Sequence, residues 1–425
     1  MSISSKLAIH GGEPLIKAPF APYPSITSEE GEAVARVVRS GQLSGFYGSD
    51  GPMFLGGAEV RAFEGEWCRR FGVPHAVSVN SATSGLFAAM GAVGVGPGDE
   101  VIVPPTTMSA TAMAPLVYGA IPVFADIDEE TFCLDPARVR EKISPRTKAI
   151  IAVNLFGHPA RLAELRELAD EKGLYLIEDN AQGPLASENG RLAGTVGHIG
   201  VFSLNYHKHI HTGEGGMCVT SDDRLAERLQ LIRNHGENLA EPRNLDDLTN
   251  LVGFNYRMSE LSAAVGRSQL AAADRHVDRR VAIAQHLSSV AKDLPGLHAP
   301  AVRHGCRHVY YLWTLRFDQS VVGVDRDIFA NALEAEGFAA YVGYVRPLYK
   351  LPLFQKRIAI GRQGYPFNQS DVRYDDVLCP TAERLWKEEF ICFETCAFDL
   401  DDAGIRQLGD ALVKVYEHRA ELSKG

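Results

Sequence analysis

The sequence predicts an α/β protein of two domains, with a mostly parallel seven-stranded sheet at the centre of the larger domain. Seven segments of strand length are apolar throughout, which is typical of strands covered by helices on both faces. Stretches of helical character separate these segments along the chain. The segments are His75–Val79, Glu100–Val103, Ile121–Asp126, Lys148–Leu155, Leu174–Asp179, Ile199–Leu204 and Met217–Thr220.

The length of the chain predicts how it divides. At 425 residues it exceeds what one hydrophobic core usually serves, so we expect two domains that share a cleft. We expect an N-terminal arm over residues 1–30, a large domain over 31–275 and a small C-terminal α+β domain over 276–425. Apolar residues at helical spacing from Tyr256 to about Leu294 mark the link between the two domains. Further elements are expected at 309–317 (strand), 326–337 (helix) and 402–421 (helix).

Charge and composition exclude several classes of protein. The formal net charge of −10 argues against a nucleic-acid partner, because phosphate backbones require a basic surface. The sequence has no run of roughly twenty apolar residues and no secretion signal, so we expect a cytoplasmic protein without a membrane partner. Its seven cysteines are scattered and form no Cys-x-x-Cys pair, which favours free thiols in a reducing compartment.

The most informative segment is the loop after Ile199–Leu204, which carries Lys208. Ser203 stands five residues before this lysine, and the glycine-rich turn Gly213–Gly216 follows it. A lysine packed into a cleft loses hydration, which lowers its pKa and makes its amine a nucleophile towards an aldehyde. A Schiff base with pyridoxal 5′-phosphate (PLP) requires such an amine. The alternative is an ordinary surface lysine.

Two upstream segments could complete a PLP site. Asp179 ends a buried strand, where a carboxylate can keep the pyridine nitrogen of PLP protonated so that the ring acts as an electron sink. Gln182 could then pack over the ring or bond its hydroxyl. The turn Ser81–Gly85 joins a strand to a helix, and its backbone N–H groups can hold a phosphate. Alternatively, Asp179 and this turn are no more than helix caps.

Three alternating histidines around the lysine raise the question of a metal site. His207, His209 and His211 would face one way on an extended segment. A catalytic metal also needs a third ligand and an open position, and His158 is the only other nearby candidate. We therefore expect no metal, with one of these rings lining the substrate pocket and the others packed or solvated.

In their order along the chain, these motifs resemble the DegT/DnrJ/EryC1/StrS sugar aminotransferases. These enzymes have the fold of PLP-dependent transferases of fold type I, which is similar to aspartate aminotransferase. The likeness covers nearly the whole chain. The segments that carry it are Leu7–Pro14, Ser81–Gly85, Glu178–Gln182, Ser203–Gly216 and Gly253–Glu260.

The resemblance implies roles for individual residues. Lys208 would be the Schiff-base lysine, Asp179 the partner of the pyridinium, and Gln182 the residue beside the ring hydroxyl. Met108 stands where the family usually places an aromatic ring over the cofactor, and a thioether can also cover a ring. The phosphate ligands would be Ala82, Thr83, Ser203 and, from the neighbouring subunit, Asn255. Because Asn255 would come from the neighbouring subunit, the resemblance also implies a homodimer with shared active sites.

The resemblance also implies a reaction, and two alternatives stay open beside it. The amino group of L-glutamate or L-glutamine would be transferred to a nucleotide-linked keto-sugar or to a keto-cyclitol. PLP-dependent sugar 3-dehydratases of the same fold are similar, but they carry His where this chain has Lys208. A non-catalytic regulator could sense a sugar through a retained fold, although it would not need Lys208, Asp179 and Gln182 together.

Overall fold

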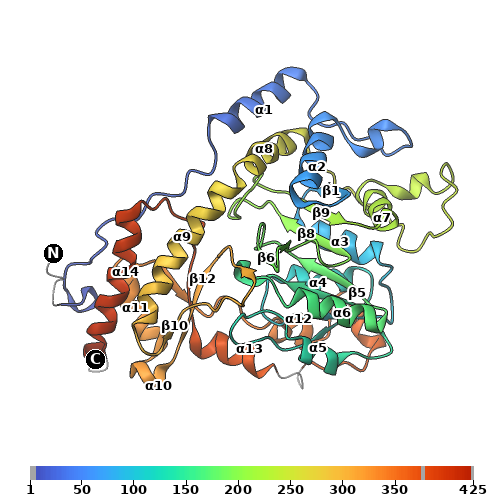
Figure 1. Ribbon diagram of the computed structural model, residues 1–425. Coiled ribbons are helices and arrows are strands. Elements are labelled where there is room, and N and C mark those ends of the chain that lie inside the picture. Colours follow the sequence, from blue (N-terminus) through green and yellow to red (C-terminus); the bar gives the residue numbers. More distant parts are fainter. Residues whose placement is uncertain (1–5, 375–378, 423–425) are drawn as a thin grey trace.

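The computed structural model of the chain contains two main β-sheets, a small third sheet and the helices around them (Figure 1). The structure describes residues 6–374 and 379–422. The large sheet has the strand order β1-β9-β8-β5-β4-β2-β3. Its strands are β1 (His75–Val79), β2 (Glu100–Val103), β3 (Ile121–Phe124), β4 (Thr147–Val153), β5 (Tyr175–Asp179), β8 (Ile199–Ser203) and β9 (Gly216–Thr220).

The pairing within this sheet confirms the predicted mostly parallel architecture. Each of the neighbours from β8 to β3 runs parallel to the next, and only β9 runs antiparallel to its two neighbours. Every strand falls on one of the expected apolar segments, and nearly every residue of these strands is buried. The carboxyl ends of β4, β5 and β8 therefore lie side by side at one edge, where ligands bind in sheets of this kind.

Helices cover this sheet in packed groups. The helix α3 contacts both α4 and α7, and α5 contacts α6. Farther out, α8 packs between α1 and α2 (Figure 1). Their bounds are α1 (Ser28–Ser40), α2 (Ala58–Phe71), α3 (Ala82–Ala92), α4 (Ala110–Val117), α5 (Pro136–Lys142), α6 (Leu162–Lys172), α7 (Asp223–Arg233) and α8 (Glu260–Ala271).

A second, antiparallel sheet has the order β10-β12-β14-β13 and a core of its own. Its strands are β10 (Leu297–His298), β12 (Trp313–Phe317), β13 (Ala340–Val342) and β14 (Phe390–Phe393). The remaining helices are α9 (Ala273–Lys292), α10 (Gln319–Val322), α11 (Arg326–Ala335), α12 (Pro352–Gln355), α13 (Pro380–Arg384), α14 (Asp402–Glu417) and α15 (Arg419–Leu422). Three short strands, β6 (Ser187–Glu188), β7 (Arg191–Leu192) and β11 (Cys306–Arg307), form a third sheet.

The start of the chain is fastened to the second core. Leu7 and Ile16 are buried there. The buried carboxylate of Glu336 accepts hydrogen bonds from the backbone N–H groups of Ala8 and Leu15 and pairs with Lys414 at 2.8 Å. The division into an arm and two domains at residues 30 and 275 stays a prediction.

One expected element is shorter than the sequence pattern indicated. The strand expected over 309–317 begins only at Trp313. Tyr310 has a φ of 51°, and this left-handed conformation breaks the extended path. Residues before Trp313 instead bond to the turn after β4, because Val309 N–H donates to Gly157 O and Leu312 N–H to Phe156 O. Among the described residues, no helix is long and apolar enough to cross a membrane.

Candidate active site

All but one of the residues that the sequence predicts for a cofactor site line a single cavity of about 330 Å³. The cavity lies beyond the carboxyl ends of β5 and β8, at the start of α3. A volume of this order is typical of small-molecule sites. The predicted residues that line it are Ala82, Thr83, Met108, Asp179, Gln182, Ser203 and Lys208. Met108 lies at an open part of the wall, since its side chain is 64% exposed.

Lys208 extends into this cavity from the loop between β8 and β9. Its amine lies 4.1 Å from the centre of the Tyr311 ring, in a cation–π arrangement. Desolvation by burial lowers the pKa of Lys208 to about 8, and the negative charge of Asp179 opposes part of that shift. The neutral fraction of the amine at neutral pH is therefore much larger than that of a lysine in water, although the ammonium form still dominates; the neutral form is the one that attacks.

Asp179 ends β5 with its carboxylate buried in the same cavity. One oxygen accepts a hydrogen bond from the Thr111 hydroxyl at 2.8 Å, and the other accepts from the Ala181 N–H at 3.2 Å. Burial raises the pKa of the Asp179 carboxyl, whereas these hydrogen bonds and the charge of Lys208 oppose the rise. A cationic ring N–H beside the carboxylate would offset the cost of burial, so Asp179 fits the pyridinium of PLP.

The first turn of α3 forms another wall of the cavity. Ser81 caps the helix by accepting from the Ser84 N–H at 3.0 Å, which leaves the N–H groups of Ala82 and Thr83 at the cavity side. β9 approaches this turn closely at Gly216, where a Cβ atom would lie 2.7 Å from Ala82 N. Only glycine fits there. With the positive end of the helix dipole, this wall suits a phosphate.

Gln182 is held from two sides. Its Oε1 accepts a hydrogen bond from the Phe156 N–H at 2.7 Å, and its Nε2 donates to the Tyr344 hydroxyl at 2.9 Å. Phe156 lies in the turn η3 (Leu155–Gly157) after β4, with a φ of 57°. Tyr344 follows β13 of the second sheet. The side chain of Gln182 thus connects the two sheets at the cavity.

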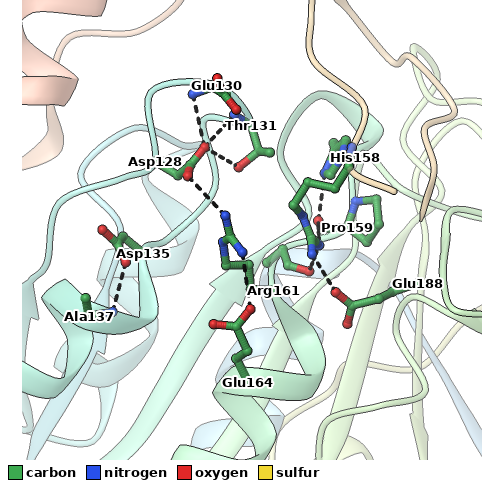
Figure 2. A network of polar contacts seen from close by, with 12 residues as sticks. Asp128, Glu130, Thr131, Asp135, Ala137, His158, Pro159, Arg161, Glu164 and Glu188 are labelled. Atoms are coloured by element: carbon green, nitrogen blue, oxygen red, sulfur yellow. Dashed lines mark hydrogen bonds and ion pairs between the residues drawn. The ribbon is translucent and has the colours of Figure 1, made fainter. Parts of the chain in front are cut away.

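A polar network adjoins the turn that carries Phe156, and Figure 2 shows His158, Pro159 and Glu188 within it. The Arg303 guanidinium donates to the carbonyl oxygens of Pro159 and Ala160 at 3.0 and 2.8 Å and pairs with Glu188 at 2.8 Å. The backbone N–H of Arg303 also donates to the His158 ring at 3.2 Å. Burial lowers the pKa of His158 to about 4, so the ring is a neutral acceptor at neutral pH. Most of these groups are buried, which makes the turn rigid.

The three histidines around Lys208 have separate environments. His207 lines the cavity, as expected for one of them. His209 and His211 are buried behind the loop, and the His211 ring bonds the Ser25 hydroxyl at 2.6 Å. Among residues 6–374 and 379–422, no group of three or more His, Cys, Asp or Glu side chains is placed to hold a metal ion.

Asn255 is the predicted site residue that does not line the cavity of its own chain. It is exposed and forms a β-bridge with Asn234. Its Oδ1 accepts a hydrogen bond from the Arg257 guanidinium at 2.8 Å. Glu260, on the helix that follows, accepts hydrogen bonds from the Gly57 and Glu59 N–H groups.

Sequence reasoning missed several residues of the site. Thr111 holds Asp179, and Tyr311, Tyr344 and Asn205 line the cavity. Thr111 is the second residue of α4, and no local pattern marks its contact with Asp179. Tyr311 and Tyr344 reach the cavity from distant parts of the chain, and no local pattern marks them.

The lowered pKa of Lys208 gives a testable pH dependence. In cofactor-free protein, reactivity of this amine with a lysine reagent should rise with a midpoint near pH 8, because below it the amine is protonated. The lysine of a short peptide should give a midpoint at about pH 10.4. Asp179→Asn should move the Lys208 midpoint lower still, because the carboxylate favours the ammonium form. Competitive labelling with mass spectrometry measures both, and a midpoint equal to the peptide's would contradict a buried amine.

Known proteins with sequences similar to this chain are named as aminotransferases. The model of the DegT/DnrJ/EryC1/StrS aminotransferase family matches residues 24–390. The chain is 34% identical to the L-glutamine:2-deoxy-scyllo-inosose aminotransferase of Streptomyces kanamyceticus, over 99% of both chains. It is 36% identical to the dTDP-3-amino-3,4,6-trideoxy-alpha-D-glucose transaminase of Streptomyces venezuelae, over 79% of this chain and 82% of that one.

Solved structures support the same assignment. The aminotransferase from Psychrobacter cryohalolentis superposes with a TM-score of 0.82 at 29% identity, over 94% of this chain and 99% of that one. This likeness confirms the predicted fold of PLP-dependent transferases. The chain therefore belongs to the DegT/DnrJ/EryC1/StrS aminotransferase family, is an aminotransferase and uses PLP as its cofactor.

Proposed function

We propose that the chain transfers an amino group from L-glutamine or L-glutamate to a keto-cyclitol at the cavity that contains Lys208. A nucleotide-linked keto-sugar is the second candidate. Two observations favour the cyclitol. The L-glutamine:2-deoxy-scyllo-inosose aminotransferase aligns with 99% of the chain at 34% identity. The charge of the cavity is the second observation, and it carries the proposal.

The described lining of the cavity contains one group that is positively charged near neutral pH, the amine of Lys208. Desolvation, followed by repulsion from Lys208, lowers the pKa of His207 to about 4. Asp179 and Glu214 bring carboxylates. The diphosphate of a nucleotide-linked sugar would have to meet its cations outside this lining, on other surfaces of the chain or of a partner subunit. Neutral donors and acceptors, such as those of Asn205 and Tyr311, suit the hydroxyl groups of an uncharged ring.

The side chains would divide the work as follows. PLP, when bound, supplies an aldehyde and an electron-withdrawing ring. Lys208 would bind the cofactor, give way to the amino donor and then take the proton from the donor's α-carbon. Asp179 would hold the proton on the ring nitrogen. Transamination needs a lysine in this role, so Lys208 favours it over the dehydratase, and a sensor would need no such amine.

The other predicted residues would hold the cofactor in place. The N–H groups of Ala82 and Thr83 and the hydroxyl of Ser203 would bind its phosphate, since all three line one end of the cavity. Met108 would cover one face of the ring through its thioether. Gln182 would face the ring oxygen with its amide.

We also propose a homodimer in which Asn255 completes the partner's site. Because Arg257 engages the Oδ1 of this amide, the Nδ2 donors are left to meet a phosphate. The exposure of Asn255 and its place outside its own cavity support this assignment.

A substrate test follows from the proposed charge match. With L-glutamine as donor, the protein should aminate 2-deoxy-scyllo-inosose with a kcat/KM on the order of a hundredfold above that for a dTDP-linked keto-sugar, because one unpaired buried phosphate charge costs at least that factor. Mass spectrometry of the amine product measures both reactions, and Lys208→Ala is the inactive control. A preference for the dTDP-linked substrate would overturn the cyclitol assignment.

Mixing of subunits tests the shared site. Lys208→Ala and Asn255→Asp should each abolish most activity, the latter because the added carboxylate repels a phosphate. In a hybrid dimer, one site carries both changes and the other carries none, so equal random mixing should restore about a quarter of wild-type activity. Native mass spectrometry verifies the exchange. If exchanged subunits stay as inactive as their parents, Asn255 serves its own chain.

A further inference from the structure

The orientation of the Gln182 amide is determined by its two hydrogen bonds. A backbone N–H can only donate, so the Phe156 N–H at 2.7 Å requires the Gln182 oxygen on its side. The nitrogen must then face Tyr344, whose hydroxyl accepts from it at 2.9 Å. One N–H of the amide is used in this bond. The other remains for a group in the cavity that Gln182 lines.

Tyr344 reaches this position through an unusual backbone path. Two consecutive residues with a left-handed backbone follow β13. Gly343 has a φ of 80° and Tyr344 has a φ of 59°. A Cβ atom at Gly343 would lie 2.9 Å from the Trp386 carbonyl oxygen, so glycine is required there. A large aromatic residue rarely adopts a left-handed conformation, and such strain is concentrated at functional sites.

The Tyr344 ring is also held by contact with the same turn that binds Gln182. It meets the Phe156 ring edge to face, with centres 4.8 Å apart and planes at 82°. Burial raises the pKa of the Tyr344 phenol above its usual range, so the hydroxyl is neutral at physiological pH. Phe156 itself is left-handed. Two aromatic residues with a left-handed backbone, one after β4 and one after β13, thus hold one amide between them.

We propose that Tyr344 is a positioning residue that acts through Gln182. Its hydroxyl and the Phe156 N–H together hold the amide so that the second N–H points to the ring oxygen of PLP. The inference rests on the proposed role of Gln182 beside that oxygen. It also links the second sheet to the cofactor, because a shift of the chain after β13 would release the amide.

A double-mutant cycle between Tyr344→Phe and Gln182→Met tests this coupling. Two measurements are made on each variant: the dissociation constant of PLP from cofactor-free protein, and the pH midpoint of the absorbance change of the bound cofactor. Tyr341→Phe removes a hydroxyl from β13 itself, outside the cavity lining, and serves as the matched control. Thermal unfolding shows that each variant is folded.

In the wild-type background, Tyr344→Phe should weaken PLP binding by about three- to tenfold, the range expected for one hydrogen bond. It should also move the absorbance midpoint to higher pH, because a ring oxygen without its N–H donor holds a proton more tightly. In the Gln182→Met background it should change neither quantity, and Tyr341→Phe should change neither in any background.

Equal effects of Tyr344→Phe in both backgrounds would overturn the inference and leave the proposed function intact. No effect in the wild-type background would also overturn it. If Gln182→Met itself changed neither measurement, the role of Gln182 in the proposed function would fall, and the inference would fall with it.

Discussion

The burial of the Lys208 amine is the constraint on which the rest of the site depends. An amine in water is almost wholly protonated at neutral pH and cannot attack an aldehyde. Here the loop between β8 and β9 places it in a cavity against the Tyr311 ring, and desolvation lowers its pKa to about 8. The opposite charge of Asp179 in the same cavity prevents a larger shift. The reactivity of the amine is thus a balance between burial and nearby negative charge, chiefly that of Asp179.

This balance requires rigid walls, which the two sheets supply together. The ends of β5 and β8 and the start of α3 form one side. Tyr311 and Tyr344 come from the chain around the second sheet, and residues 309–312 bond to the turn after β4. Arg303 holds that turn from behind. The cavity therefore exists only when both sheets are in place, and its shape depends on their contact.

The sequence was sufficient to predict the large sheet and the site residues at the ends of its strands. Lys208, Asp179 and the turn at Ser81 follow apolar segments directly, so the rule that ligands bind beyond the carboxyl ends of parallel strands brings them together. The second sheet was harder to predict. Its strand at 309–317 was expected too long, because the left-handed turn at Tyr310 has no local signature. Tyr344 was missed for the same reason, since its direction is set by Gly343 and by contacts distant in sequence.

The central claim is that Lys208 is the amine that binds PLP, and borohydride reduction of the holoenzyme tests it most directly. Reduction followed by proteolysis and mass spectrometry should place the phosphopyridoxyl group on the peptide that contains Lys208. The same treatment of Lys208→Arg should leave no stable adduct, because a guanidinium does not form the bond. An adduct on another lysine of the wild-type protein would contradict the account.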